Sequence, residues 1–412
     1  MDRRLGNKDF VPVILGTGLG AYNVARCLHE AYGARSLALG RAALPETADS
    51  RIIDVEVVTS FDTAEGILAT LDAVAKKLPT RKLLLIPTIE FYTNVVADHA
   101  DKLNSRYIVP GISKDLNDLL LDKADFYDTC RRAGVAYPET YVVDQAIPDD
   151  AQLEECGITY PLILKPSNTD LYPRVDFEGK KKVYLIGDAG ELHRTITDIR
   201  RGGYGDALIL QRYISGDETV MKVANCYSDS RGRVSGVAPA QVILTDRHPQ
   251  RVGNNDALMP GPDEEIATSL RSFLDTLGYR GFVNADFLYD PQQGRYLILE
   301  MNLRLGASAH YTMSAGINLV KLMVDDLVYN RYVEACRMPS EESLWINVPL
   351  PLVLATAPKA LRSRAARAAT RGLRHTLFYR YDLSVRRLKR ILPLEARMVR
   401  DHLRYAESVL NR

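Results

Sequence analysis

Three oxygen-bearing side chains flank a turn in the C-terminal half of the chain. Asp286 precedes the Pro- and Gly-containing turn at residues 290–294, and Glu300, Asn302 and then Arg304 follow it. Folding about this turn as a β-hairpin places Asp286 opposite Glu300, and Asn302 shares a face with Glu300 because strand side chains alternate. Two carboxylates and an amide oxygen suit Mg²⁺, which completes its coordination with water and phosphates. Taken alone, the same residues also fit a solvated strand face.

Two lysines and one extended segment earlier in the chain could complete a nucleotide site. Lys123 opens a predicted helix, Lys165 ends an apolar strand, and residues 211–218 follow another strand. Lysines supply cations for polyphosphate oxygens, and an extended strand exposes backbone groups to an adenine edge. Glu218 is placed to accept hydrogen bonds from ribose hydroxyl groups. Each lysine alone is more often a surface residue, so the ordered set is what favours a nucleotide site.

A glycine-rich loop at residues 16–21 follows the first predicted strand and opens a helix. Its GxGxxA pattern is a weak match to a dinucleotide fingerprint, and no carboxylate stands about 20 residues later to bind a ribose. Arg41 at that place leaves an NADP site open as an alternative. A loop whose backbone amides close against a substrate at a helix start is favoured.

The elements that must position these residues fall into two patterns. Apolar strands near 11–15, 36–39, 55–58 and 83–86 alternate with helical segments near 19–32, 62–77 and 89–102. This alternation is typical of an open parallel α/β domain. From about residue 140 the pattern changes to short strands and hairpins around helices near 189–201 and 263–278, which predicts a catalytic part of α+β type.

The chain of 412 residues is too long for one ordinary core. We expect an N-terminal domain at 1–120, a nucleotide-binding and catalytic domain at 121–335, and a basic helical extension at 336–412. The central domain divides into a small ATP-binding subdomain near 140–215 and a catalytic subdomain near 216–335.

Charge and cysteine usage exclude several classes of protein. The net charge is +1, but residues 359–412 hold fifteen Lys/Arg and four Asp/Glu. Such a tail predicts an anionic partner, either a membrane surface or the phosphates of a large substrate, unless it is a solvated helix packed on the body. Nucleic acid is the weakest alternative because no RNA motif or zinc finger accompanies it. Five scattered cysteines and no long apolar run indicate a cytoplasmic protein, with peripheral contact at the inner face of the membrane as an extension.

The ordered motifs resemble those of the ATP-grasp superfamily of carboxylate–amine and carboxylate–thiol ligases, and within it the D-aspartate ligase group. The resemblance is carried by residues 10–33, 165–168, 177–182, 211–218, 253–254 and 281–306. It implies an ATP-grasp fold preceded by an open parallel α/β domain. Two positions depart from the common superfamily pattern: Asn284 stands where arginine is frequent, and Gln211 stands where glutamate is common. In having asparagine at position 284, the chain resembles the D-aspartate ligase group.

The resemblance also implies a role for each candidate residue. ATP would be contacted by Lys123, Lys165 and Lys182, by a hinge of Gln211, Arg212, Tyr213 and Ile214, and by Glu218 at the ribose. Loop 167–182 would be the mobile phosphate cover. Magnesium would be held by Asp286, Glu300 and Asn302, with Mn²⁺ as an alternative ion. Arg304 would face the acyl phosphate, and His310 either takes the amine proton, holds a substrate carboxylate, or is a structural histidine.

The function expected from this resemblance is formation of an amide through an acyl phosphate. A carboxylate attacks the γ-phosphorus of ATP, and an amine then displaces phosphate, chemistry that needs positioning and charge neutralisation but no Ser or Cys nucleophile. The expected acid is D-aspartate, and the expected acceptor is the lysine amine of a peptidoglycan precursor, with a homodimer left open. Three alternatives remain: an ATP-grasp ligase for another acid, a non-catalytic nucleotide-binding protein, and an NADP oxidoreductase.

Overall fold

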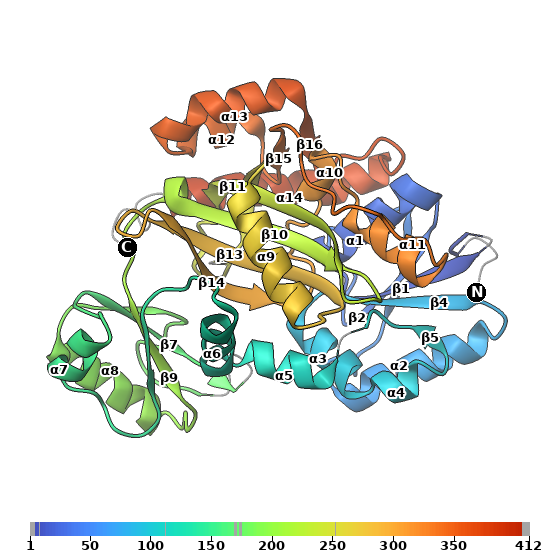
Figure 1. The fold of residues 1–412 in the computed structure, drawn as a ribbon. Coiled ribbons are helices and arrows are strands. Elements are labelled where there is room, and N and C mark those ends of the chain that lie inside the picture. Colours follow the sequence, from blue (N-terminus) through green and yellow to red (C-terminus); the bar gives the residue numbers. More distant parts are fainter. Residues whose placement is uncertain are drawn as a thin grey trace.

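The structure is a computed structural model that describes residues 5–7, 9–111, 113–168, 171–172, 175–251 and 253–405. Three β-sheets form its framework, and helices cover their faces (Figure 1). Four positions of the expected phosphate cover, 169–170 and 173–174, lie outside the described residues, as does the end of the basic tail at 406–412.

The N-terminal sheet is parallel, with the strand order β3-β2-β1-β4-β5. Its strands are β1 (Phe10–Leu15), β2 (Ser36–Gly40), β3 (Ile53–Val57), β4 (Lys82–Pro87) and β5 (Tyr107–Ile108). Its helices are α1 (Leu19–Tyr32), α2 (Ala64–Lys77), α3 (Glu90–Asp98) and α4 (Ala100–Leu103). The predicted open parallel α/β domain is therefore confirmed. The order reverses between β1 and β4, and ligands of open α/β sheets bind at the carboxyl ends of strands at such a point.

Two helices connect this domain to the rest of the chain. They are α5 (Lys114–Leu121) and α6 (Lys123–Ala133), so a helix begins at Lys123 as predicted. Asp122 caps α6, because its side chain accepts hydrogen bonds from the amides of Ala124 and Asp125.

The small sheet is antiparallel, with the order β6-β9-β7-β8. Its strands are β6 (Thr140–Val143), β7 (Leu162–Pro166), β8 (Tyr184–Ile186) and β9 (Leu208–Arg212), and its helices are α7 (Asp150–Glu155) and α8 (Ala189–Arg201). Leu162, Leu164, Leu208 and Leu210 are fully buried against α8, which gives this unit a core of its own.

The large sheet has seven strands in the order β14-β13-β10-β11-β12-β15-β16. Its first five members in the chain are β10 (Met221–Ser228), β11 (Val234–Thr245), β12 (Asn255–Pro260), β13 (Gly281–Asp290) and β14 (Arg295–Asn302). The helices that follow or flank them are the 3-10 helices η2 (Glu218–Val220) and η3 (Pro249–Arg251), α9 (Glu264–Thr276), α10 (Tyr311–Ser314) and α11 (Leu319–Leu327). Antiparallel pairing of β10 with β13 and of β13 with β14 brings three strands of the predicted catalytic part side by side.

The C-terminal extension is helical, with α12 (Leu350–Thr356), α13 (Lys359–Arg371) and α14 (Val385–Arg404). It also contributes β15 (Leu344–Ile346) and β16 (Leu373–His375), which continue the large sheet beyond β12. The sequence analysis missed both strands because three residues are too few to show alternation. No helix among the described residues has the length and apolar character needed to cross a bilayer.

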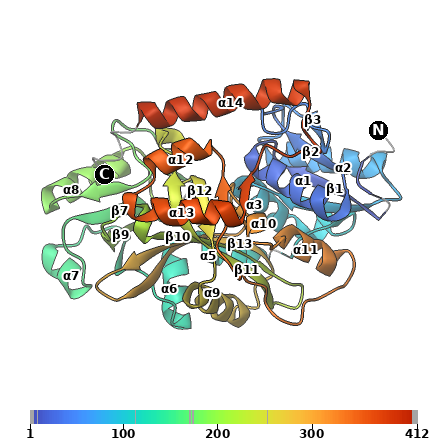
Figure 2. The same ribbon diagram turned by 90° about the horizontal axis from the view of Figure 1, so that it is seen from above.

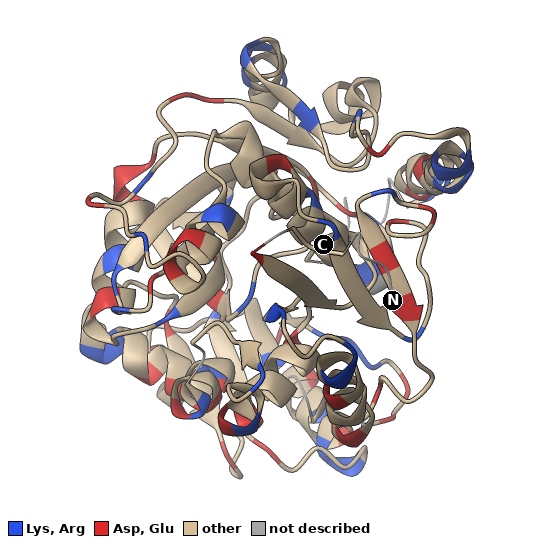
Figure 3. Ribbon diagram, turned by 90° about the vertical axis from the view of Figure 1, so that its right-hand side faces the viewer, with Lys and Arg blue, Asp and Glu red and all other residues tan. Residues whose placement is uncertain are grey.

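Helix α14 runs along one side of the molecule, from the N-terminal domain to the large sheet (Figure 2). The fully buried guanidinium of Arg387 donates hydrogen bonds to the carbonyl oxygens of Pro45 and Ala48, at 2.8 and 2.9 Å. At the other end, His402 Nε2 lies 2.7 Å from Asp256 Oδ2. Figure 3 shows α14 nearly end-on, with Lys and Arg on its outer side. One face of the tail is therefore packed and the other is charged.

Candidate active site

The hairpin of β13 and β14 has the predicted register: Asp286 is opposite Glu300, and Asn284 is opposite Asn302. A β-bulge at Leu299 shifts the register between these pairs and the turn. The carbonyl oxygen of Leu299 accepts a hydrogen bond from Tyr127 Oη on α6 at 2.5 Å. The bulge therefore joins the metal-ligand candidates to the helix that begins with the first candidate lysine.

Asp286 and Glu300 carry opposite pKa shifts although both are carboxylic acids. Burial, and after it the negative charge of Glu300, raises the pKa of Asp286 to about 8. Burial would also raise the pKa of Glu300, but Lys123, Lys182 and Lys165 lower it below its ordinary value. The pair therefore holds one negative charge more readily than two, which is a setting in which a divalent cation is favourable.

The three candidate lysines lower the pKa of Glu300 from α6, from β7 and from the loop before β8. Lys123 and Lys182 line the same cavity as Glu300 and Asn302, which has a volume of about 70 Å³. Lys165 donates hydrogen bonds to Tyr127 Oη at 2.8 Å and to Gln211 Oε1 at 3.1 Å. Burial lowers the pKa of Lys165 to about 8, against the attraction of Glu300. Buried cations without a full set of anionic partners suit a ligand that brings phosphates.

The hinge residues at 211–214 differ in which of their groups are already engaged within the protein. Gln211 is buried, and its Nε2 donates to Thr140 Oγ1 at 2.9 Å, while Arg212 forms ion pairs with Glu139 and Asp290. Tyr213 and Ile214 leave the sheet directly after β9. The ion pairs of Arg212 occupy its guanidinium group, so only its backbone remains for a nucleotide.

Glu218 lies in η2, beyond the hinge. Its Oε1 accepts a hydrogen bond from Thr245 Oγ1 at 2.8 Å, and its backbone carbonyl accepts one from the Gln241 side chain. Both partners come from β11 and fix the position of the carboxylate.

Arg304 and the residues after it form the far end of the candidate site. Arg304 Nη2 lies 3.2 Å from Asn302 Oδ1, and its Nε is buried without a hydrogen-bond partner among the described residues. The amide of Gly306 donates to Asn225 Oδ1 at 3.1 Å. A Cβ atom at Gly306 would lie only 2.6 Å from Asn284 Oδ1, so this backbone approach requires glycine. The loop is thus held closely against β10 and β13.

His310 lies apart from the cavity that Glu300 lines. It is fully buried, and its Nε2 is 3.7 Å from Glu30 Oε1 on α1, beyond hydrogen-bond distance. Burial lowers the pKa of His310 to about 4, so the imidazole is neutral near pH 7. This placement fits the structural alternative better than either substrate role.

The sequence analysis did not single out Glu90, Tyr127 or Asn225, although each contacts the candidate site. Glu90 opens α3 at the point where the order of the parallel strands reverses, lines the cavity with Glu300, and stabilises the charge of Arg304. The strand order predicted by doubly wound folds is the signal that could have identified Glu90. Tyr127 and Asn225 carried no sequence signal, because each acts through a contact between distant elements.

The glycine-rich loop after β1 has a packing role in this fold. A Cβ atom at Gly16, whose φ is +120°, would lie 2.3 Å from Thr88 Oγ1 at the end of β4. Arg41, the residue considered for a 2′-phosphate, pairs with Asp62 Oδ2 at 3.1 Å. Close packing of β1 on β4 explains the glycine without a dinucleotide.

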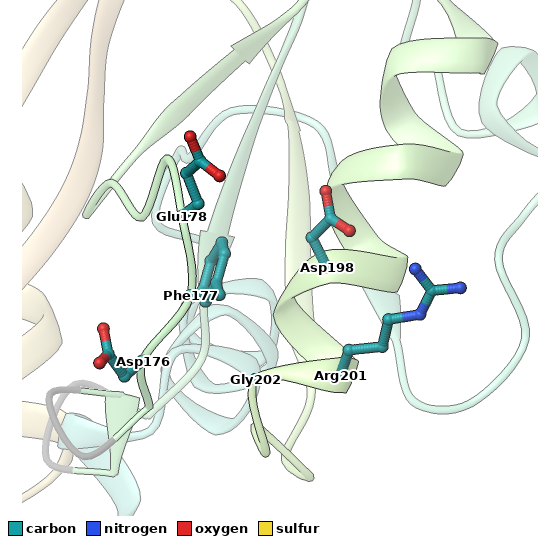
Figure 4. A pocket seen from close by; sticks show the side chains of 6 residues that line it. All are labelled: Asp176, Phe177, Glu178, Asp198, Arg201 and Gly202. Atoms are coloured by element: carbon teal, nitrogen blue, oxygen red, sulfur yellow. The ribbon is translucent and has the colours of Figure 1, made fainter.

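A larger cavity, of about 450 Å³, lies in the small domain between residues 176–178 and α8 (Figure 4). Its charged side chains are Asp176, Glu178, Asp198 and Arg201. A Cβ atom at Gly202 would lie 2.8 Å from the Phe177 ring, so this part of the expected cover loop packs tightly against the end of α8. Among the described lining residues, three carboxylates and one cation do not suit a polyphosphate, so the cavity around Glu300 fits a nucleotide better.

The residues around Glu300 fit both ATP and magnesium. No group of three His, Cys, Asp or Glu side chains within the described part of the chain could hold a metal ion by itself. The available set is two carboxylates and one amide oxygen, which leaves coordination positions for water and phosphate oxygens. The lysines around it supply the charge that those phosphates need.

The chain is similar to known proteins over most of its length. Residues 219–325 match the family described as carbamoyl-phosphate synthase L chain, ATP binding domain. D-aspartate ligase of Enterococcus faecium (strain Aus0004) is 32% identical over 397 residues, which covers 94% of each chain.

Two solved structures have a similar fold. One is the biotin carboxylase domain of 2-oxoglutarate carboxylase from Hydrogenobacter thermophilus, in complex with MgADP, ADP and bicarbonate, with a TM-score of 0.60 at 18% identity. That match covers 82% of this chain and 74% of the other. The other is L-amino acid ligase from Bacillus licheniformis, with a TM-score of 0.55 at 16% identity, covering 78% and 74%. At these identities the two likenesses show the fold.

Proposed function

The chain belongs to the D-aspartate ligase family of the ATP-grasp superfamily, and from this premise we propose that it joins D-aspartate to the lysine side-chain amine of a peptidoglycan precursor. It is an ADP-forming carboxylate–amine ligase that uses ATP and Mg²⁺. The observation that carries the proposal is the buried Asp286–Glu300 pair with three lysines converging on it. The match to D-aspartate ligase along the whole chain supports the choice of acid.

In this proposal each of the three parts of the chain has a separate role. Residues 1–120 supply one wall of the substrate site, residues 121–335 bind ATP and carry the chemistry, and residues 336–412 brace the two. Within the central part, residues 140–215 and 216–335 enclose the nucleotide from opposite sides. The contacts of α14 with both the N-terminal domain and β12 support the bracing role.

We assign ATP binding to the residues around the two inner sheets. Lys123, Lys165 and Lys182 hold phosphate oxygens, residues 211–214 present backbone groups to adenine, and Glu218 accepts from the ribose. The hydrogen bonds of Lys165 to Tyr127 and Gln211 support its part, because they hold the ammonium group at the edge of the site. Bound phosphates would replace water around the lysines and restore their charged form.

Asp286, Glu300 and Asn302 hold magnesium in this proposal, and Mn²⁺ substitutes for it because the same oxygen ligands accept both ions. The ion would supply charge neutralisation for the transferred phosphoryl group. Arg304 then faces the acyl phosphate, and its orphaned Nε supports this orientation. Attack of the neutral amine nitrogen on the carbonyl carbon forms the amide, breaks the carbon–oxygen bond to the phosphate, and releases inorganic phosphate and a proton. His310 is assigned to packing against α1.

The test uses purified protein with ATP, Mg²⁺, D-aspartate and hydroxylamine as a surrogate amine. Hydroxamate and ADP should form with D-aspartate and at a much lower rate with L-aspartate. Equal rates with both enantiomers would contradict the stereochemical part of the proposal. ADP release with a different acid, and none with D-aspartate, would identify another ATP-grasp ligase, and no release with any acid would indicate a non-catalytic protein.

We further propose a cytoplasmic enzyme that contacts the anionic inner face of the membrane through α14. Val385, Leu392 and Leu403 are 72%, 54% and 66% exposed on this helix. Exposed basic side chains surround them: Arg386, Lys389, Arg397, Arg400 and Arg404. A basic face with an apolar ridge is typical of helices that lie at a lipid surface.

Sedimentation with vesicles checks the membrane contact. The protein should bind phosphatidylglycerol vesicles at low salt, release from them at high salt, and leave phosphatidylcholine vesicles unbound. Arg386→Glu with Arg397→Glu should abolish the binding and leave hydroxamate formation unchanged. Binding that ignores both salt and charge reversal would contradict this account.

A further inference from the structure

A second cavity adjoins the cavity around Glu300. It lies between α3 and α5, has a volume of about 320 Å³, and is therefore within the usual range of small-ligand sites. Glu90 and Leu121 line both cavities, so they form the wall between them. The charged side chains on its lining are Glu90, Asp98, Lys114, Asp118 and Asp122.

This second cavity is more acidic than its neighbour. Among its described lining residues, four carboxylates stand against one cation, Lys114, whose ammonium nitrogen lies 2.8 Å from both Asp98 Oδ1 and Asp118 Oδ2. In the described lining of the cavity around Glu300, Lys123 and Lys182 balance Glu90 and Glu300. A polyphosphate is repelled by the second cavity, and a cation is attracted to it.

One buried side chain in the wall indicates what kind of cation fits. Asn117 is 3% exposed, and its Nδ2 donates a hydrogen bond to Asn94 Oδ1 at 3.1 Å. Its Oδ1 is buried and has no hydrogen-bond partner among the described residues. A buried acceptor without a donor is costly, so a ligand with N–H groups would stabilise this wall. Carboxylates and an orphaned carbonyl oxygen together favour a primary ammonium group.

We propose that this acidic cavity receives the acceptor of the ligase reaction, as a primary ammonium at the end of an alkyl arm. The inference rests on the proposed function, because an acyl phosphate at Arg304 needs an amine that arrives from outside the phosphate site. The cavity draws the ammonium to Asn117 and the carboxylates. After the ammonium loses a proton to one of these carboxylates, the neutral amine passes Glu90 into the cavity around Glu300. The rest of the acceptor stays outside on the surface of α3 and α5.

Two charge variants at the mouth of the cavity test the proposal in opposite directions. Asp118 and Lys114 are exposed, so substituting either leaves the fold intact. With a short peptide that has one free lysine side chain as acceptor, Asp118→Asn should raise the KM about two- to fivefold, and Lys114→Met should lower it by a similar factor. In both variants kcat should stay constant. Asp115→Asn is the matched control, because it removes the same charge from the same helix outside the cavity.

Hydroxylamine separates this inference from the proposed function. It is small and largely uncharged at neutral pH, so its KM should not change in either variant. Unchanged peptide KM values, or equal changes for hydroxylamine and peptide, would overturn the acceptor site while the ligase function stands. If hydroxylamine supports no ADP release with any acid in the unmodified protein, the proposed function fails and the inference fails with it.

Discussion

The two cavities that meet at Glu90 differ in charge: the described lining of one is acidic, and in the other Lys123 and Lys182 balance the carboxylates. Asp122 and Lys123 are consecutive residues at the break between α5 and α6, yet Asp122 lines the acidic cavity and Lys123 lines the cavity around Glu300. The helix break turns adjacent side chains in different directions. A ligase must bring a polyanion and an ammonium to one carbonyl carbon, and this arrangement keeps their binding sites apart until that point.

The largest effect is expected at Glu300, which lines its cavity together with Lys123 and Lys182. Glu300→Ala should lower hydroxamate formation at least about a thousandfold, because three lysines lose their anionic partner and, under the proposed function, the metal loses a ligand. Glu264→Ala, on the exposed face of α9, is the control and should retain full activity. Activity in Glu300→Ala would mean that the cavity around Glu300 is not the catalytic one, and the contrast between the two cavities would lose its functional meaning.

A somewhat smaller effect is expected at Arg304, at the far end of the candidate site. Arg304→Ala should reduce kcat about a hundred- to a thousandfold and leave the KM for ATP nearly unchanged, because the proposed function assigns the guanidinium group to the acyl phosphate and not to the nucleotide. Steady-state kinetics with varied ATP separates the two parameters. A raised KM for ATP with unchanged kcat would place Arg304 with the nucleotide instead.

The protonation of Lys165 should make nucleotide binding depend on pH. Burial lowers its pKa to about 8, so its charged form is present below that pH and is lost as the pH rises through it. Metal-free ADP should therefore bind progressively more weakly above about pH 8. Lys165→Met should weaken binding about ten- to a hundredfold at pH 7 and remove most of this pH dependence. Calorimetric titration at several pH values is the measurement, and a pH dependence that persists in Lys165→Met would assign it to another group.

The smallest effect sharpens the comparison in the acidic cavity. If its mouth acts through net charge, the double variant Asp118→Asn with Lys114→Met should return the KM for the lysine peptide to within about twofold of the original value. Each single change shifts the KM in the opposite direction, and the two should cancel. A double variant that stays as impaired as Asp118→Asn alone would show that this one carboxylate acts by direct contact.

Local sequence signals were sufficient for the parts of the site that lie within one element or one hairpin. The turn at residues 290–294 predicts the pairing of Asp286 with Glu300, and the sequence predicts a helix that begins at Lys123; both are observed. The bulge at Leu299 was not predictable, because it depends on Tyr127 from another helix. Strands β15 and β16 were missed for a related reason, since each is stabilised by pairing with a distant strand.

The sequence by itself determined the identity of the chemical groups: two carboxylates and an amide at hairpin spacing, and lysines in a fixed order before them. Periodicity and turn residues act over a few positions, so they fix the hairpin and the helices without knowledge of the rest. Only the tertiary structure decided which lysines surround Glu300, that His310 packs against α1, and that an acidic cavity adjoins the cavity around Glu300. Those features depend on contacts between elements tens to hundreds of residues apart, and burial at these contacts sets the pKa values and the electrostatic field of the site.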